Sequence, residues 1–363
     1  MRDRKTILYL LILSTFLLSM MALLASAETS HTNSAKSSAL YNPDTKTFLQ
    51  RKNAEAKLPM ASTTKIVTAL VAIESLDLDE IITVQKEAVG IEGSSLYLKE
   101  GDKLTVRDLV YSVLLQSAND ASCVLALRIS GGIPEFADKM NARAKAIGAK
   151  NTNFENPHGL DSANHYTTAE DLCLIAAEAL SNDIFKKISS TYKYSFNIGD
   201  STRTVINHNK LLKTYDGCIG VKTGFTKKCG RCLVSAATKQ DITLIAVTLN
   251  DPDDWRDHRS MLNYGFDNLE AVDISDLTEL PEDLPTVSAD GARVAIKPRE
   301  DTLVKYKNED IKFSLDLPPY ISKDLKSGDK IGEIIINVGD REKTIDIIAT
   351  NGVKIKKNTK RFF

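Results

Sequence analysis

The spacing of hydrophobic residues changes twice along the 363-residue chain. An almost wholly apolar stretch runs from Ile7 to Leu24, helix-like and strand-like segments then alternate to about residue 268, and only short strand-like runs follow Ala271. A helical period predicts buried or amphipathic helices, whereas short β-branched runs between turns predict strands. We therefore expect an α+β domain followed by a small all-β domain.

Six segments of the middle part carry a helical pattern. The clearest is the apolar run that begins at Lys65, after the helix breaker Pro59, and it predicts a buried helix over residues 62–76. Asp120 is placed to cap a later helix, and Thr167-Thr168-Ala169-Glu170 fits a capping box. The other helices are expected over residues 104–117, 120–130, 134–147, from the capping box to about Leu180, and over 255–265.

Strand-like segments lie at both ends of this middle part. Lys36–Tyr41 and Thr47–Gln50 flank the turn signal Asn42-Pro43-Asp44-Thr45 and predict a hairpin. Three β-branched runs near the other end are separated by short polar or glycine-containing turns, at 218–224, 232–238 and 242–249. Such consecutive runs predict antiparallel strands, so we expect an antiparallel sheet built from both ends of the domain.

The C-terminal part has no helical period. Prolines punctuate strand-like runs such as Ile331–Val338 and Thr344–Ile348, which is typical of a small all-β domain. We expect the first domain at residues 28–270, the β-rich domain at 271–352 and a basic tail at 353–363. The tail ends in two phenylalanines, so peripheral contact with anionic lipid is one interpretation and a solvated chain end is the other.

The N-terminus has the layout of a secretory signal peptide. Arg2, Arg4 and Lys5 precede the apolar stretch, and Ala25-Ser26-Ala27 supplies a small-residue cleavage site. The stretch also approaches the length of a membrane-spanning helix, so an uncleaved anchor is the alternative. In both cases residues 1–27 predict that the rest of the chain is exported and works outside the cytoplasm.

Composition narrows the function less than the motifs do. Hydrophobic residues make up 42% of the chain and charged residues 26%, as in ordinary soluble proteins, and the net charge is -1. Because the chain has no surplus of basic residues, nothing in its composition indicates a nucleic-acid partner.

Five cysteines are an odd number for an exported chain, so at least one is unpaired or bonded to another chain. Cys229-Gly230-Arg231-Cys232 matches C-x-x-C, but it has no partner pair and no redox-fold pattern, which argues against a redox or zinc role. Cys123 and Cys173 lie in apolar helical patterns and are expected in the core. A disulfide between Cys218 and Cys229 across a hairpin stays open.

Ser62-Thr63-Thr64-Lys65 is the first of three short motifs that carry chemistry. S-x-x-K also occurs at Ser190 and Ser327, so the motif alone says little. Only Ser62 opens a predicted helix, where residues three apart share a face and the free N–H groups favour an oxyanion. A neutral serine needs a base within hydrogen-bond reach, and we expect Lys65 to be that base.

Ser117-Ala118-Asn119 and Lys222-Thr223-Gly224 complete the set. A lysine acts as a base only when it is neutral, and burial together with the second cation Lys222 would lower the pKa of Lys65. Lys222 is also expected to attract a substrate carboxylate. We expect Ser117 to relay a proton to the leaving amine, and Asn119 to hold Lys65 and a substrate amide.

The run from Lys222 to Thr226 predicts a strand edge. A peptide substrate can add to such an edge as an extra strand, and Gly224 lets the backbone approach it closely. The N–H groups of Ser62 and Phe225 are expected to form an oxyanion hole. None of the five histidines lies in a nucleophile-elbow context, although a Ser-His-Asp triad assembled in space is not excluded by the sequence.

With these motifs in place, the chain resembles the D-alanyl-D-alanine carboxypeptidases, low-molecular-mass penicillin-binding proteins of the serine peptidases with a β-lactamase-like fold. The resemblance covers most of residues 36–350. Longer matching stretches are Leu58–Lys65, Gly93–Leu98, Asn156–Asp161, His165–Ala169 and Asp216–Thr226.

The resemblance implies a reaction. Ser62 is acylated by the penultimate D-alanine of a peptidoglycan pentapeptide stem, the terminal D-alanine leaves, and water hydrolyses the acyl-enzyme. Lys65 is the implied general base, Thr223 and Thr226 are implied to hold the terminal carboxylate, and β-lactam antibiotics are implied inhibitors. No cofactor and no metal is implied.

Two features of the chain depart from the family pattern or stay unassigned. Cys229 stands where a small residue such as alanine is usual, which places a thiol near the site. Some members add an arginine from the later helix region, and Arg256 lies near that place in a register that the sequence does not fix.

Two other classes of protein compete with this interpretation. A β-lactamase uses a glutamate-positioned water from an E-x-x-L-N loop, and Glu155-Asn156-Pro157-His158 does not fit that pattern. A non-catalytic peptidoglycan-binding module has no use for an intact Ser62 and Lys65. Endopeptidase or weak transpeptidase activity at the same site stays open, because only the leaving group or the acceptor changes.

Overall fold

The computed structural model describes residues 33–356. These residues divide into two compact units, one formed by residues 33–238 with 243–265 and the other by 239–242 with the chain from 266 onward. The predicted signal peptide at 1–27 and residues 357–363 of the predicted tail lie outside the described residues. Within 33–356, no helix is both long enough and apolar enough to cross a membrane.

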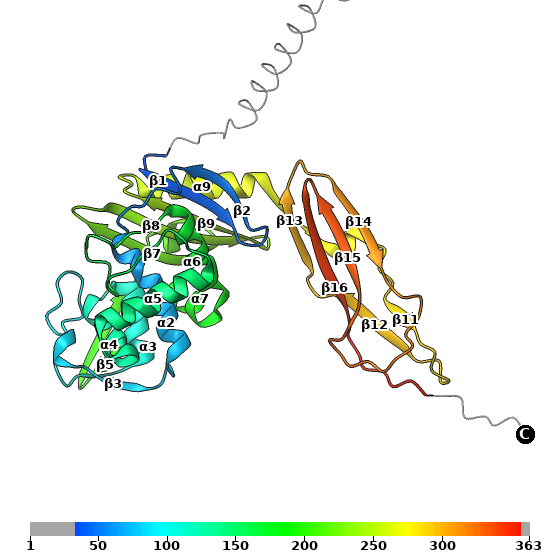
Figure 1. Ribbon diagram of the computed structural model, residues 1–363, viewed down its shortest axis with the longest axis horizontal. Helices are drawn as coiled ribbons and strands as arrows, with labels where there is room; N and C mark the ends of the chain where they lie inside the picture. Colours follow the sequence, from blue (N-terminus) through cyan, green and yellow to red (C-terminus); the bar gives the residue numbers. More distant parts are fainter. Residues whose placement is uncertain (1–32, 357–363) are drawn as a thin grey trace, which may run out of the picture. The chain divides into compact units, whose positions relative to one another are not determined.

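A five-stranded sheet forms one layer of the first unit (Figure 1). The predicted hairpin and the three predicted strands are confirmed as β1 (Ser37–Asn42), β2 (Thr47–Lys52), β7 (Cys218–Thr226), β8 (Gly230–Lys239) and β9 (Ile242–Leu249). The strand order is β2-β1-β9-β8-β7, and Ser37 of β1 lies opposite Leu249 of β9. Both ends of the domain therefore build the sheet, as predicted, and β7 is left at its edge.

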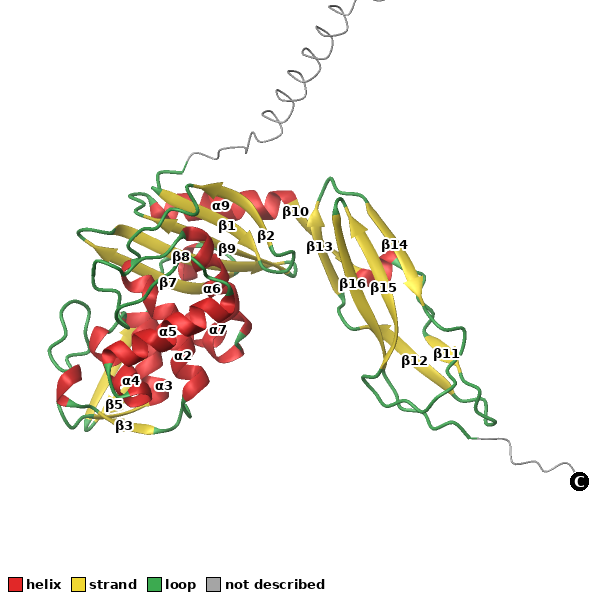
Figure 2. Ribbon diagram, in the orientation of Figure 1, coloured by secondary structure: helices red, strands yellow, loops and turns green. Residues whose placement is uncertain are grey.

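Helices cover both faces of this sheet (Figure 2). On one face lies α9 (Asp254–Asn268), whose buried His258 bonds to Ser235 of β8 and Thr248 of β9. The other face carries α2 (Lys65–Ser75), α3 (Val106–Tyr111), α4 (Asn119–Ser130), α5 (Ile133–Ile147), α6 (Ala169–Ser181) and α7 (Asp183–Ser189). As predicted, α2 is buried along most of its length.

The helix predicted over residues 104–117 is wrong at its start. Residues there begin as the short strand β4 (Lys103–Thr105), which pairs with β3 (Ile81–Thr83). Thr105 and Asp108 then form a capping box, so α3 cannot begin before Val106. Thr105 and Asp108 were visible in the sequence as a possible cap, but the helical spacing of apolar residues continued before Thr105 and placed the helix start too early.

The end of the same predicted helix is also different. After α3 the chain widens into a π-helix, η3 (Ser112–Gln116), and Ser117 follows with a left-handed backbone at φ 62. A left-handed conformation is uncommon for a residue with a side chain, and such π turns often lie at functional sites. Hydrophobic periodicity does not distinguish an α turn from a π turn, so this widening could not be predicted.

Both predicted helix caps are displaced. The N-cap of α4 is Ala118, and the Asp120 carboxylate instead accepts hydrogen bonds from a neighbouring loop. The capping box predicted from Thr167 is one residue off, because Thr168 is the N-cap of α6 and accepts from the Asp171 N–H. Thr167 and Thr168 are both suitable N-cap residues, and in the folded chain Thr168 is the one that caps α6.

Several short elements complete the first unit. These are η2 (Lys86–Ala88), the hairpin of β5 (Lys193–Ile198) and β6 (Ser201–Ile206), and the single turn α8 (Leu211–Thr214). Ser190, the start of another S-x-x-K match, is exposed at the end of α7. It therefore has none of the burial that surrounds Ser62-Thr63-Thr64-Lys65.

The second unit is all-β apart from the single turn α10 (Ile274–Leu277), which confirms its predicted class. Its strands form two sheets, β10-β13 and β11-β12-β16-β15-β14 (Figure 2). Val294, Ile334 and Ile347 are fully buried between them. The strands are β10 (Leu269–Asp273), β11 (Asp283–Pro285), β12 (Arg293–Pro298), β13 (Thr302–Tyr306), β14 (Ile311–Asp316), β15 (Lys330–Val338) and β16 (Arg341–Ala349).

Candidate active site

The chain before α2 folds into a single tight turn that carries Ser62. This turn, η1 (Ala61–Thr64), is a 3₁₀ helix that runs directly into α2 at Lys65. Ala61 has a left-handed backbone with φ 47, and the Thr64 hydroxyl donates to the Ala61 carbonyl at 2.8 Å. Ser62 therefore lies at the start of a buried helix, as predicted. The turn that carries it is closed by the hydrogen bond from the Thr64 side chain.

The Lys65 amine lies among three oxygen atoms and is wholly buried. Its Nζ is 3.0 Å from Ser62 Oγ, 2.6 Å from Asn119 Oδ1 and 2.6 Å from the backbone oxygen of His158. Ser62 comes from η1, Lys65 from α2 and Asn119 from α4. Residues predicted from two separate motifs thus meet at the Lys65 amine.

The chemistry of the three oxygen atoms decides how the protons of Lys65 are arranged. Asn119 Oδ1 and the His158 carbonyl only accept hydrogen bonds, so each takes one N–H of the amine. A protonated amine donates its third N–H to Ser62 Oγ at 3.0 Å. Once neutral, the amine has two N–H groups and one lone pair, and this lone pair is left facing the Ser62 hydroxyl. The geometry therefore suits a neutral Lys65 that can receive the Ser62 proton.

The electrostatic surroundings favour the same neutral state. Burial, and after it the charge of Lys222, lower the pKa of Lys65 well below its ordinary value of 10.5. Burial alone lowers the pKa of Lys222 to about 7. Both causes named from the sequence therefore act on Lys65.

Asn119 and Asp120 hold the loop that begins at Gly93 beside Lys65. The Asp120 carboxylate accepts from Ser95 Oγ at 2.6 Å and from the Leu98 N–H at 3.1 Å. A Cβ at Gly93 would lie only 2.8 Å from Asn119 Nδ2, and its φ of +90 also favours glycine. The Gly93–Leu98 stretch, which sequence reasoning left without a role, therefore borders the site.

Ser117 is buried in the connection between η3 and α4. Within residues 33–356, its hydroxyl makes no hydrogen bond to Ser62, Lys65 or Lys222. Ser117 precedes Asn119 by two residues, and the Asn119 side chain contacts Lys65 directly.

Lys222, Thr223 and Gly224 lie on the edge strand β7, against the turn η1. Lys222 is 1% exposed, and its Nζ donates to the Thr223 carbonyl at 2.9 Å. A Cβ on Gly224 would lie 3.0 Å from the backbone nitrogen of Ser62 and 3.1 Å from the Met60 oxygen. Only glycine lets the strand lie this close to the nucleophile's turn.

The free edge of β7 faces outward at alternate residues. In an antiparallel pair, backbone groups point alternately toward and away from the partner strand. Phe225 follows Thr223 by two residues, so the backbone groups of these two residues point to the same side of β7. The Phe225 side chain is 66% exposed.

A cavity of about 380 Å³ opens beside this edge and has both apolar and charged walls. Thr223 and Phe225 form the strand side, and Lys210, Arg231 and Trp255 lie opposite or around it. Arg231 is tied to the buried Asp254 by an ion pair of 2.6 Å. The cavity thus offers basic groups next to the strand that carries Thr223.

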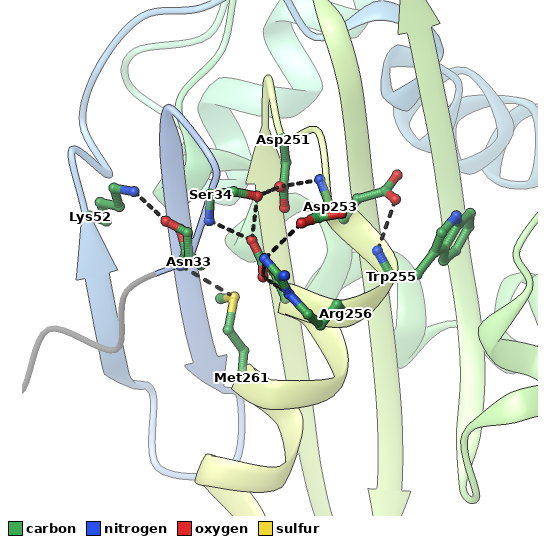
Figure 3. Close-up of polar contacts among 10 residues, drawn as sticks. Asn33, Ser34, Lys52, Asp251, Asp253, Trp255, Arg256 and Met261 are labelled. Carbon is green, nitrogen blue, oxygen red and sulfur yellow. Dashed lines mark hydrogen bonds and ion pairs between the residues drawn. The ribbon is translucent and has the colours of Figure 1, made fainter.

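Arg256 lies elsewhere at the start of α9. It is 69% exposed and forms ion pairs with Asp253 at 2.8 Å and Asp257 at 3.3 Å (Figure 3). The Asp257 carboxylate also accepts from Ser34 Oγ at 2.7 Å, which ties the segment before β1 to α9. Arg256 is therefore paired with the aspartates that hold the segment before β1 against α9. The arginine that lines the cavity is Arg231.

Neither histidine near the nucleophile acts on its hydroxyl. Burial lowers the pKa of His158 to about 3 and that of His165 to about 4, so both rings are neutral. His165 Nδ1 accepts from the Glu155 N–H at 3.0 Å, so its Nε2 carries the proton and donates to Thr64 Oγ1 at 2.7 Å. The hydroxyl of Ser62 contacts Lys65 instead, which does not favour the triad alternative.

The loop over residues 156–160 lies in a stretch that matched the family, but sequence reasoning gave it no role. Its contact with Lys65 is made by the backbone carbonyl of His158, and every residue type has such a carbonyl. The available signal was Gly159, whose Cβ would lie 1.9 Å from the Ala61 oxygen. A glycine required by close approach marks where this loop presses against the turn η1.

We expect Gly159→Ala to destabilise the protein by about 3 kcal/mol, combining the left-handed backbone with overpacking. The new methyl group would meet backbone atoms, which cannot rotate away, at φ +86. The matched control is Gly101→Ala, because Gly101 has the same φ of +86 and nothing within 4 Å. Urea unfolding measures both, and equal losses in the two variants would show that the contact with Ala61 is unimportant.

The cysteines differ from the open disulfide prediction. Cys218 lies opposite Ala237 on β8, whereas Cys229 contacts Cys232, and all five cysteines are free. The Cys218–Cys229 bond, which the sequence left open, is not formed, because the two residues sit at opposite ends of the β7–β8 hairpin. Cys123 and Cys173 are buried at 2% and 0% exposure, as predicted.

Comparison with known sequences gives one family over most of the first unit. A sequence profile described as D-alanyl-D-alanine carboxypeptidase matches residues 24–253. The D-alanyl-D-alanine carboxypeptidase DacF of Bacillus subtilis is 30% identical over 340 residues, covering 90% of this chain and 86% of that protein. A D-alanyl-D-alanine carboxypeptidase of Streptomyces is 35% identical over 263 residues, covering 67% and 90%.

Two solved structures of similar proteins cover about nine-tenths of this chain, and a third covers about two-thirds. The D-alanyl-D-alanine carboxypeptidase DacD of Francisella tularensis has a TM-score of 0.65 at 27% identity and covers 90% of this chain and 95% of its own. Penicillin-binding protein 5 of Haemophilus influenzae has a TM-score of 0.67 at 26% identity, with 89% and 98% covered. A Streptomyces DD-transpeptidase has a TM-score of 0.62 at 35% identity, with 65% and 98% covered.

Proposed function

Because the chain belongs to the D-alanyl-D-alanine carboxypeptidases, a family of serine peptidases, we propose that Ser62 is its acylated nucleophile. The substrate is the pentapeptide stem of peptidoglycan, and Ser62 attacks the carbonyl of the penultimate D-alanine. The observation that carries this proposal is the 3.0 Å contact between Lys65 Nζ and Ser62 Oγ inside a buried site.

In the acylation step, the Ser62 proton passes to the lone pair of Lys65 as Oγ bonds to the substrate carbon. The negative charge on the carbonyl oxygen is received by the N–H groups of Ser62 and Phe225. The close packing of Gly224 against the Ser62 nitrogen supports this oxyanion hole. Collapse of the intermediate breaks the peptide bond, and Ser117 delivers a proton to the departing D-alanine amine.

Binding of the substrate uses the free edge of β7. The stem peptide adds to this edge, with its terminal carboxylate at Thr223 and Thr226 and with Lys222 supplying positive charge. Asn119 holds Lys65 and the substrate amide. The basic wall that Arg231 forms beside Thr223 supports a carboxylate at this place. Water then hydrolyses the ester on Ser62 and frees the shortened stem.

β-Lactam antibiotics present the same carbonyl and carboxylate and therefore acylate Ser62. A β-lactamase would need a glutamate that activates water for rapid release. Glu155 instead accepts from the Asn164 N–H at 3.0 Å, and in the described residues it contacts neither Ser62 nor Lys65. A long-lived penicilloyl-enzyme is therefore expected.

Two measurements on the purified chain test this function. Intact mass after incubation with a penicillin should show one stable adduct, and a muramyl pentapeptide should release D-alanine. Lack of any adduct would overturn acylation of a serine, and rapid loss of the adduct would favour a β-lactamase. An adduct without release of D-alanine would favour a non-catalytic binding module, and transfer of the acyl group to an added amine would reveal transpeptidase activity.

We expect a bell-shaped dependence of acylation on pH. A lysine with a lowered pKa becomes neutral at lower pH than usual, so the rate should rise through the depressed pKa of Lys65, far below 10.5. Above a pH of about 7 Lys222 loses its proton, and attraction of the carboxylate weakens. Stopped-flow acylation from pH 4 to 10, buffered at constant ionic strength, measures both limbs. A rising limb centred near 10.5 would contradict the role of Lys65.

We also propose that residues 1–27 direct export and that the enzyme works on peptidoglycan outside the cytoplasm. The substrate class supports this location, because peptidoglycan lies there. The mature N-terminus is expected at Glu28, which mass spectrometry of the exported protein checks. Peripheral contact of the basic tail at 353–363 with the membrane is tested by flotation with anionic vesicles before and after its removal.

A further inference from the structure

Two buried thiols meet behind the turn that carries the nucleophile. Cys229 and Cys232 are 2% and 1% exposed, and their sulfur atoms lie 3.2 Å apart. The sulfur of Cys229 also lies 3.0 Å from the backbone oxygen of Pro59, and that of Cys232 lies 3.9 Å from it. Pro59 precedes Ser62 by three residues, so the thiol pair supports the chain that enters η1.

We propose that Cys229 and Cys232 form a reversible disulfide and that its formation slows the acylation of Ser62. The proposal rests on the function proposed above only where it names Ser62. The C-x-x-C spacing did not by itself indicate a redox role, because no redox fold accompanied it. The contact between the two sulfurs, which the hairpin geometry creates, supplies the missing observation.

The oxidation needs an external disulfide, such as glutathione disulfide or a thiol–disulfide oxidoreductase, and compartments outside the cytoplasm favour such exchange. The thiolate of one cysteine attacks a sulfur of this oxidant, which forms a mixed disulfide and releases one thiol. The second cysteine then displaces the other thiol and closes the Cys229–Cys232 bond. Two electrons and two protons thereby pass from the cysteines to the oxidant.

The reaction is expected to be slow in the folded protein. The hydrogen bond with Cys232, followed by burial, raises the pKa of Cys229, so little thiolate is present. Exchange therefore needs an opening of the turn between β7 and β8, or it takes place as the chain folds. Because exchange is slow, the reduced or oxidised state of the cysteine pair would persist through many catalytic cycles.

Bond formation moves atoms next to the proposed oxyanion hole. The sulfurs must approach from 3.2 Å to about 2.05 Å, a displacement of about 1 Å. Cys232 lies directly opposite Gly224, which packs against the Ser62 nitrogen. The Cys229 N–H donates to Thr226 Oγ1 at 2.9 Å. The displacement therefore reaches β7 at Gly224 and at Thr226, the two residues that flank Phe225.

Oxidation also removes a hydrogen bond from the nucleophile's turn. In the thiol form, Cys229 donates its S–H to the Pro59 carbonyl, whereas a disulfide has no proton to donate. Because a misplacement of about 1 Å at a reacting centre costs about a hundredfold in rate, we expect acylation to slow by about ten- to a hundredfold.

The test uses the full chain equilibrated for hours in glutathione buffers from fully reduced to fully oxidised. Free thiols are then blocked with N-ethylmaleimide, and peptide mass spectrometry identifies the linked residues. The second-order rate of penicillin acylation is measured on the same samples. We expect a Cys229–Cys232 linkage in oxidised buffer, a slower rate that follows its extent, and recovery of both after reduction with dithiothreitol.

Matched variants separate this pair from other thiols. Cys229→Ala lacks the S–H that bonds to Pro59 and cannot form the disulfide, so it is expected to acylate at one rate in every buffer, and Cys218→Ala is expected to keep the full response. Absence of the linkage, or a linkage that leaves the rate unchanged, would overturn the proposal. If the reduced protein itself formed no penicillin adduct, the proposed function would fail, while the linkage would still be read by mass spectrometry.

Discussion

Ser62→Ala is expected to abolish the covalent penicillin adduct and the release of D-alanine. No other hydroxyl in the described residues contacts the Lys65 amine, so no second nucleophile is activated in its place. Removal of a catalytic serine from a site of this kind costs about a millionfold in turnover. Intact mass and D-alanine release measure the loss, and reversible penicillin binding should remain because the rest of the pocket is intact.

The chain provides its own control for this substitution. Ser190 starts another S-x-x-K match but is exposed at the end of α7, so Ser190→Ala should react as the unaltered protein does. An adduct of full yield on Ser62→Ala would place the nucleophile elsewhere. Loss of the adduct in both variants would indicate damage to folding rather than to chemistry.

Lys65→Met is expected to slow acylation by about a thousandfold or more, within the range of general-base catalysis together with its effect on orientation. Methionine fills the buried volume but has no lone pair of comparable basicity for the Ser62 proton. It also leaves Asn119 Oδ1 and the His158 carbonyl without their donor, so a stability loss of about 2 kcal/mol accompanies the change. Single-turnover acylation below the unfolding temperature measures the rate separately from stability.

Two comparisons keep the two effects of Lys65→Met apart. Lys193→Met alters the lysine of the exposed S-x-x-K match, and no change is expected. Asn119→Ala removes one partner of Lys65 and should lower stability to a similar extent while keeping the base. If Lys65→Met were acylated as fast as Asn119→Ala, the role of Lys65 as proton acceptor would be wrong.

The sequence predicted the elements that have a strong period or a chemical motif. Ser62 and Lys65 were assigned from one motif and Asn119 from a second motif farther along the chain, and the two motifs meet within hydrogen-bond distance of the Lys65 amine. The sheet built from both ends was predicted because its strands are β-branched and its turns are short. In these cases local pattern and tertiary structure agree, which is the expected behaviour of a chain with little frustration.

The features that sequence reasoning missed depend on backbone atoms or on tertiary choice. The His158 carbonyl and the π turn before Ser117 have no side-chain signature. Asp120 looked like a helix cap, yet its carboxylate is used by the loop that follows Gly93. Short polar side chains have several local partners of similar energy, and distant packing selects among them.

The pairing of β1 with β9 has a consequence for the order in which the first unit folds. Ser37 meets Leu249, so the first strand to leave the ribosome waits for one of the last strands of its domain. Pairings between such distant segments form slowly, and until then α2 has no completed sheet to cover. We infer that the buried site around Ser62 and Lys65 is completed only after β9 has been synthesised and has paired with β1.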